Sequence, residues 1–264
     1  MDRLGVTPPF ELKEPFVTVS VDDGNPSDLR AAELLAKLGY SATFYVPARN
    51  GEKKVLGATE VRLLAELFEL GAHGYDHLNL RTLSTDSARY EIRNGKAWLE
   101  DTISRQVNSF CYPLGKFNRR IANLVIEEGF IGARTTQTNI VTSPIDVFTS
   151  GVTTFISPRR RFVHARHAVI EGNWTGLNNF ARIFRFATDW TDHFERGVSY
   201  VSAHGGVAHI WFHSGYLDQH DQWSRLEQLL RRLKGEYQFR CATNGYLFAL
   251  YSTQRPAKES DTLG

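Results

Sequence analysis

The stretch FVTVSVDDGNPSDLRAAELLAKLG, residues 16–39, decides the fold class of this chain. Its first six residues are dense in Val and Phe, which favours a β-strand. After the helix-start signal PSD (26–28), apolar residues recur at the spacing of one helical face until Gly39, a typical C-terminal stop. A strand followed at once by a helix is the unit that builds sheets of parallel strands covered by helices.

The same order of elements recurs along the chain. Further runs that predict strands are ATFYV (42–46), SFCYP (109–113) and AHIWFH (208–213), and a segment with helical spacing follows each of them. The helix after ATFYV is expected to end at Gly71. Because the runs are apolar rather than alternating, they are typical of strands buried on both faces, as in a parallel sheet or barrel.

The stretch from about residue 135 to 175 interrupts this rhythm. It holds two prolines, the triplet Arg159-Arg160-Arg161 and the β-like run HARHAVI. We expect an inserted loop or hairpin there. The triplet and Arg166 either form a solvated face of that hairpin or, if they line a cleft, indicate an anionic substrate.

Length and composition limit the architecture and the partners. The chain has 264 residues, with 31 basic and 29 acidic side chains and a formal net charge of +2. We expect one domain over 1–264, with its core at about 16–250 and a frayed polar tail at 256–264. The near balance of charge gives no reason to expect a nucleic-acid partner.

The sequence shows no apolar segment long enough for a signal peptide or a transmembrane helix. Its two cysteines, Cys111 and Cys241, allow at most one disulfide, which favours a reduced compartment. We therefore expect a cytoplasmic protein without a transmembrane segment. Contact with a membrane surface and the oligomeric state stay open.

Polar residues follow the ends of the predicted strands, where parallel α/β folds place their working residues. Asp22 and Asp23 follow the first strand, and His213 ends the run AHIWFH. His73 and His77 are four residues apart, which is metal-ligand spacing, although capping or core hydrogen bonding is the alternative. Two histidines and one aspartate with an open fourth position fit a catalytic Zn²⁺ or a related divalent ion. Of two adjacent carboxylates, one can bind the cation while the other serves as base.

Four motifs resemble the polysaccharide deacetylase family, the NodB-homology domains of carbohydrate esterase family 4. They stand in the order and approximate spacing of that family: SVDDG (20–24), HGYDH (73–77), YPLG (112–115) and IWFH (210–213). The resemblance covers roughly residues 16–250. It implies an α/β fold of one catalytic domain, a distorted (β/α) barrel of about seven parallel strands.

The resemblance also implies a metal site. Carried over by motif, the ligands are Asp23, His73 and His77. They would hold one divalent ion, with Zn²⁺ expected and Co²⁺, Ni²⁺ or Mn²⁺ as alternatives.

The remaining motif positions take catalytic and substrate-binding roles by the same resemblance. Asp22 becomes the catalytic base and His213 the general acid. Leu114 offers its backbone N–H to the oxyanion, and its neighbours Tyr112 and Pro113 bind or orient the substrate.

This chain departs from the family pattern at three places. The arginine that often opens the third motif, where it orients the base, is replaced by Cys111. Arg134, in GART, is predicted either to supply the missing guanidinium from another strand or to be an ordinary surface residue. Trp211 takes the Leu position of the last motif and is expected to line the acetyl pocket, with a core role as the alternative. The letters of the family's Asp-Trp motif occur at Asp189-Trp190, but they fall in a predicted helix, so core packing of this Trp is expected.

These residues predict a metal-dependent hydrolase that removes an acetyl group, first of all an N-acetyl group, from a sugar in a polysaccharide or glycoconjugate precursor. Two alternatives stay open. One is a metal-dependent amide hydrolase that acts on a small non-sugar substrate. The other is a catalytically inactive carbohydrate-binding domain.

Overall fold

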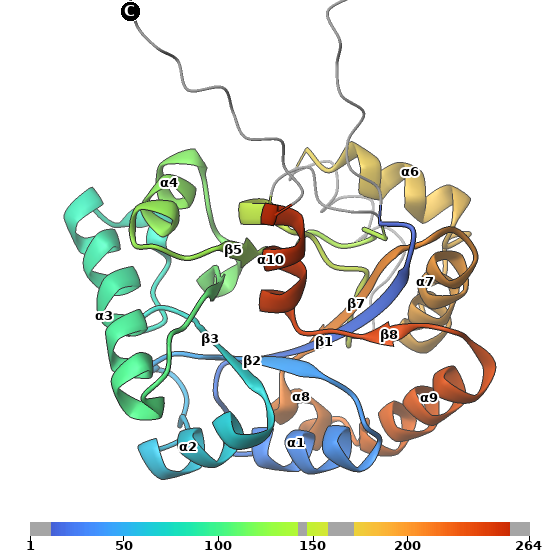
Figure 1. Ribbon diagram of the computed structural model, residues 1–264, viewed down its shortest axis with the longest axis horizontal. Coiled ribbons are helices and arrows are strands. Elements are labelled where there is room, and N and C mark those ends of the chain that lie inside the picture. The colour runs from blue at the N-terminus through green and yellow to red at the C-terminus, as the bar shows by residue number, and fades with distance from the viewer. Residues whose placement is uncertain (1–11, 142–146, 158–171, 254–264) are drawn as a thin grey trace, which may run out of the picture.

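The computed structural model describes residues 12–141, 147–157 and 172–253. Within these residues, parallel strands form one eight-stranded sheet that curls into a partial barrel, with helices around its outside (Figure 1). The strands are β1 (Pro15–Asp22), β2 (Ala42–Val46), β3 (Glu69–Ala72), β4 (Ser109–Cys111), β5 (Gly132–Arg134), β6 (Thr154–Phe155), β7 (Gly206–Phe212) and β8 (Arg240–Cys241).

Most helices follow a strand and pack against the outside of the sheet, as the sequence rhythm predicts. The helices are α1 (Asp28–Lys37), α2 (Ala58–Leu67), α3 (Thr85–Ile103), α4 (Arg119–Glu127), α6 (Trp174–Arg182), α7 (Trp190–His204), α8 (Ser214–Gln219), α9 (Trp223–Glu236) and α10 (Asn244–Thr253). The part of the chain that the structure describes also contains the short 3₁₀ turns η1 (Leu80–Thr82), η2 (Pro113–Gly115) and η3 (Val147–Thr149).

The strand order places the carboxyl ends of the strands side by side. The path through the sheet is β5-β4-β3-β2-β1-β7-β6, and β8 pairs with the first half of β1. In register, Asp22 of β1 faces Tyr45 of β2, and Val21 faces Phe212 of β7. The residues that follow β1, β3, β4 and β7 therefore meet at one edge of the sheet.

The stretch predicted as an insertion contributes to the barrel itself. Ser150 exchanges backbone hydrogen bonds with the chain around β5, and Thr154 pairs with Ile210 of β7. The run VTTFI (152–156) thus lies between the two edges of the sheet, as expected for residues with high β-propensity. The triplet Arg159-Arg160-Arg161 and Arg166 lie outside the described residues.

One local prediction is wrong. Gly71 does not end a helix: α2 ends at Leu67, and Gly71 lies in β3, where a Cβ would be 2.4 Å from the Tyr45 ring. The helix-start signal at residues 26–28 is confirmed, because α1 begins at Asp28. Asp28 is fully buried as the first residue of the helix and accepts a hydrogen bond from Ser214 Oγ at 2.5 Å.

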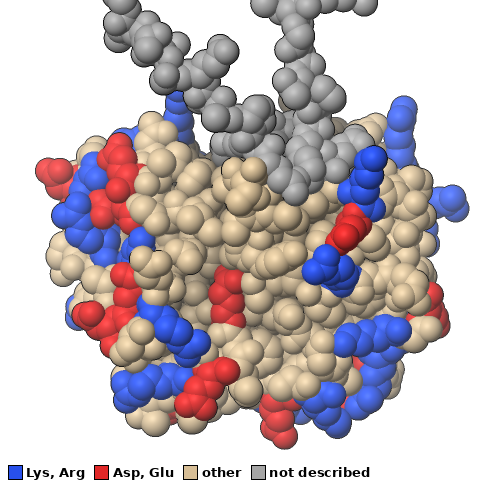
Figure 2. Space-filling model, viewed as in Figure 1, with Lys and Arg blue, Asp and Glu red and all other residues tan. Residues whose placement is uncertain are grey.

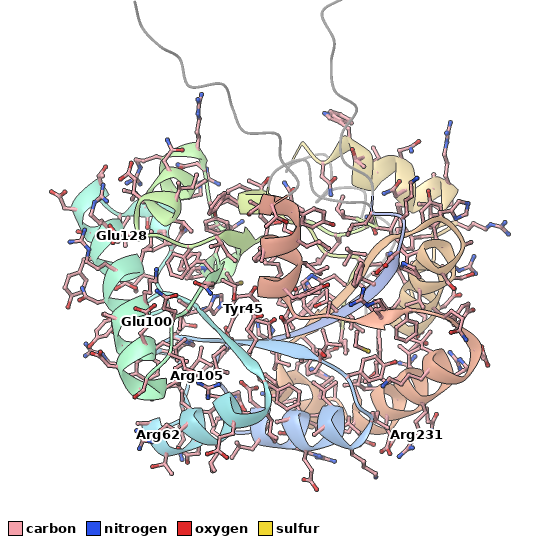
Figure 3. All side chains as sticks on the ribbon, in the orientation of Figure 1. Tyr45, Arg62, Glu100, Arg105, Glu128 and Arg231 are labelled. Atoms are coloured by element: carbon pink, nitrogen blue, oxygen red, sulfur yellow. The ribbon has the colours of Figure 1, made fainter. Side chains whose placement is uncertain are left out.

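Helix α10 closes the opposite end of the barrel (Figure 1). The backbone N–H of Gly245 donates to the half-buried Glu69 carboxylate at 2.9 and 3.0 Å, at the positive end of the helix dipole. The side chain of Asn244 donates to the hydroxyl of Tyr45 at 2.9 Å. Figure 3 labels Tyr45. Charged residues lie mainly toward the periphery of this face, whereas its centre around α10 is largely uncharged (Figure 2). The amino end of the barrel is thereby filled, and open space lies at the carboxyl end.

Gly132 marks a close approach between β5 and α10. A Cβ at this position would lie 2.3 Å from Cγ of the buried Phe248. We expect Gly132→Ala to lower the free energy of unfolding by about 1–3 kcal/mol, as overpacking of a core does, measured by urea unfolding. Gly235→Ala in α9 is the matched control, because its Cβ meets nothing within 4 Å and alanine favours a helix by about 0.5–1 kcal/mol. Equal losses in both variants would contradict the explanation.

Among the described residues, no helix combines the length and apolar content needed to cross a membrane.

Candidate active site at the carboxyl edge of the barrel

The carboxyl edge of the sheet holds a cleft of about 300 Å³. Its floor is formed by polar residues that follow three different strands, and its walls come from the loops after β2, β4 and β5 and from β6 and β7. The lining residues are Asp22, Asp23, Asn50, Glu52, Lys53, His73, His77, Tyr112, Leu114, Gly115, Lys116, Thr136, Thr138, Phe155, Trp211 and His213.

The three predicted metal ligands meet at one point. Oδ1 of Asp23 lies 3.5 Å from Nε2 of His73 and 3.2 Å from Nε2 of His77. Two ligands of one tetrahedral Zn²⁺ lie about 3.3 Å apart, given metal–ligand bonds of about 2.0–2.1 Å. The donor atoms and their separations therefore fit one divalent ion.

Backbone conformation and hydrogen bonding aim these side chains at the same point. Asp23 and His77 both adopt left-handed conformations, with φ of 80° and 56°, which sharply turn the chain after β1 and in the loop after β3. Nδ1 of His73 bonds to the carbonyl oxygen of Cys111 at 2.8 Å, which leaves Nε2 to face Asp23. Burial alone would raise the pKa of Asp23, but hydrogen bonds with the two histidines lower it well below its usual range. Asp23 is thus an anion that can hold a cation.

A second group of potential ligands, Asp22, His73 and Cys111, is also close enough to share an ion. However, the Arg134 guanidinium donates to both oxygens of Asp22, and burial raises the pKa of the Cys111 thiol. A thiol and a carboxylate already paired with a cation are poor metal ligands, so the group around Asp23 fits better.

Arg134 places a guanidinium beside Asp22, the predicted base. It ends β5, is fully buried, and donates to both oxygens of Asp22. Its guanidinium also lies over the rings of Tyr45 and Trp211, 5.2 and 4.8 Å from their centroids. Burial would lower the pKa of Arg134, but the Asp22 carboxylate raises it above its ordinary value. The structure therefore places Arg134 beside Asp22 and not on the surface.

The predicted general acid lies on the other side of Asp23. Nε2 of His213 is 3.6 Å from Oδ2 of Asp23. Burial lowers the pKa of His213 below its ordinary value, although Asp23 and Asp22 oppose this shift. The rings of Phe155 and Trp211 pack against it edge-on, at 5.7 and 5.2 Å, and stack on each other at 4.2 Å.

Some residues of the third motif line the cleft, and others pack in the core. Leu114 adopts a left-handed conformation with φ of 58° and lines the cleft, and the residue is 57% exposed. Tyr112 also lines the cleft, but its hydroxyl donates to the carbonyl oxygen of Phe148 at 2.8 Å. Pro113 is buried, and its Cγ would lie 3.2 Å from a Cβ at Gly74, which places it against the loop of His73 and His77. The role of Pro113 in binding or orienting the substrate stays a prediction.

Asp189 and Trp190 lie away from this cleft. Asp189 caps α7 and pairs with Arg225 at 2.6 Å, and Trp190 is buried, as expected for core packing.

Several residues of the cleft were not predicted from the sequence, among them Lys53 and Phe155. Lys53, from the loop between β2 and α2, places Nζ 2.9 Å from Oδ2 of Asp23. No motif or periodicity pointed to it. Phe155 lies in the stretch taken for an insertion, where the β-rich run VTTFI was the signal that could have placed it on a strand.

The fold and the cleft define an α/β barrel with an Asp–His cluster at the carboxyl edge of its sheet. Residues 11–131 match the model of the polysaccharide deacetylase family, which confirms the resemblance drawn from the motifs. The protein named "Putative polysaccharide deacetylase YxkH" of Bacillus subtilis (strain 168) is 24% identical over 127 residues, which are 47% of this chain and 46% of that protein. The chain thus matches about half the length of this curated relative.

Solved structures share the fold at low sequence identity. The chitin deacetylase of the fungal pathogen Colletotrichum lindemuthianum superimposes with a TM-score of 0.59 at 15% identity, over 90% of this chain and 89% of that one. The wild-type BA3943 of Bacillus anthracis, described as a CE4 family pseudoenzyme, gives a TM-score of 0.52 at 17% identity, over 90% and 66% of the two chains. These likenesses confirm the predicted distorted (β/α) barrel.

Proposed function

We propose that the protein is a metal-dependent hydrolase that removes an acetyl group, first of all an N-acetyl group, from a sugar. The observation that carries the proposal is the Asp23–His73–His77 group with a second, Arg134-paired carboxylate, Asp22, beside it. A divalent ion supplies such a site with a Lewis acid that polarises a carbonyl and makes water more acidic. The match of residues 11–131 to the polysaccharide deacetylase model supports a deacetylase.

In this proposal two side chains of the cleft each carry out one proton transfer. Asp22 accepts the proton of the attacking water, while Arg134 holds its carboxylate in position. His213 gives a proton to the departing amine. The backbone N–H of Leu114 donates to the oxyanion that forms on the former acetyl carbonyl.

The alternative of an inactive binding domain has a structural neighbour in the BA3943 pseudoenzyme. What supports an enzyme here is that Asp22, Asp23 and all three histidines of the motifs are present and line one cleft. The alternative of a small non-sugar amide keeps the same residues and differs only in substrate.

Metal content and acetate release test the proposal together. We expect about one divalent ion per chain and its loss in His77→Ala, because only two of the three proposed ligands remain. Turnover should then fall by more than the roughly 10- to 100-fold that follows loss of a residue outside the ligand set. His220→Ala, an exposed histidine outside the cleft, is the control.

Elemental analysis and acetate assays on acetylated sugars and on small amides provide the readouts. Unchanged metal content in His77→Ala would count against the site. Acetate release from amides alone would favour the non-sugar substrate, and tight glycan binding without any acetate release would favour the binding domain.

A further inference from the structure

Two lysines line the cleft from different loops. Lys53 lies between β2 and α2, and Lys116 directly follows η2. Lys116 is exposed, and among the described residues its ammonium group has no ion pair. Neither lysine belongs to a motif used for the proposed chemistry.

Without a metal, the charged side chains of the cleft balance, because Asp22, Asp23 and Glu52 offset Lys53, Lys116 and the buried Arg134. Asp22 is already paired with the fully buried Arg134, and Asp23 is shared by two histidines as well as by Lys53. Among the lining residues described, Glu52 is the remaining carboxylate. With a divalent ion at Asp23, the cleft carries a surplus of positive charge that an anionic ligand would balance.

Lys53 is positioned to contribute to such binding. Its ammonium group has three N–H donors, and the contact with Oδ2 of Asp23 at 2.9 Å uses one of them. The side chain is 51% exposed, so the other donors are accessible from the cleft. Because Asp23 already restrains the ammonium group, Lys53 loses less conformational freedom on binding a ligand than an unrestrained lysine would.

We propose that Lys53 and Lys116 bind a phosphate or carboxylate group of the substrate, so that the preferred substrate is an acetylated sugar that carries an anionic group. The inference rests on the proposed function and adds the substrate class. Ammonium groups bind both kinds of anion as point charges, so the experiment has to separate the two.

The test uses the metal-loaded chain of residues 1–264 and compares three substrates: N-acetylglucosamine, its 1-phosphate, and the corresponding uronic acid. We expect kcat/KM for acetate release to favour one of the two anionic sugars by about tenfold or more, the factor that charge-assisted hydrogen bonds typically give. Lys53→Gln and Lys116→Gln should each reduce this preference several-fold, mainly through KM. The preference should also shrink as salt is added.

Lys54→Gln is the matched control, because Lys54 is the exposed neighbour of Lys53 and does not line the cleft. It should leave the preference unchanged. The metal content of Lys53→Gln is measured alongside, because Lys53 contacts the proposed ligand Asp23. If the metal content falls, the substrate preference of Lys116→Gln alone tests the inference. A preference for the 1-phosphate identifies a phosphate group, and one for the uronic acid a carboxylate group.

The two proposals fail in different ways. Equal kcat/KM for all three sugars, or a preference that both lysine variants retain, overturns the inference and leaves the deacetylase intact. Absence of acetate release from every sugar overturns the deacetylase instead. Calorimetric binding of the same sugars then decides the inference: tighter binding of an anionic sugar that both variants lose supports it, and equal binding contradicts it.

Discussion

Arg134→Met is expected to lower the free energy of unfolding by about 3–5 kcal/mol, the cost of removing one partner from a buried ion pair. Asp22 is only 2% exposed, and Arg134 donates to both of its oxygens. Removing the guanidinium therefore leaves a buried carboxylate without its cation. Urea unfolding of the two proteins measures the loss.

The kinetics of the same variant show whether Arg134 positions Asp22 for catalysis or only stabilises the fold. If Arg134 orients Asp22 for catalysis, kcat should fall while KM stays nearly unchanged, because the guanidinium does not touch the substrate. Arg134→Lys should recover part of the stability, since it restores a cation. It should not recover the full kcat, since an ammonium group lacks the planar guanidinium that bonds both Asp22 and the Thr135 carbonyl oxygen. If Arg134→Lys and Arg134→Met both kept wild-type kcat in their folded fraction, Arg134 would be a structural residue only.

The sequence was most informative where local pattern and tertiary structure agree. The strand and helix of residues 16–39 were predicted because apolar runs and helical spacing both reflect burial in the barrel. Strand β3 was missed because its sequence, ELGA, has a low β-propensity; the pairing with β2 determines it instead. The strand β6 was missed because it has two residues in a stretch marked by prolines and arginines.

The sequence predicted those residues of the candidate site that lie at the ends of predicted strands. Asp22, Asp23 and His213 follow strands that the apolar pattern located, so their convergence followed from the parallel fold. Arg134 could be suggested only from the chemistry, because a base without its usual guanidinium needs another cation. Lys53 depends on the path of a loop between β2 and α2, and no local sequence signal records such a path.

Asp22→Asn is expected to keep the metal and to lose about 10²- to 10⁴-fold in turnover, the usual contribution of a positioned general base. Elemental analysis should still find the ion, since Asp23, His73 and His77 are intact. The structure adds that the variant should also be less stable, because Arg134 is left as a buried cation beside a neutral amide.

The double variant Asp22→Asn with Arg134→Met separates these two effects. Neither residue then leaves a buried charge unpaired, so the double variant should be more stable than the sum of the single losses predicts, by about 0.5–3 kcal/mol. Turnover should not recover, because no base has been restored. Recovery of turnover in the double variant, or retention of wild-type turnover in Asp22→Asn, would assign the proton transfer to another group. The coupling in stability tests the ion pair, and the loss of turnover tests the base, so the two roles of Asp22 can fail independently.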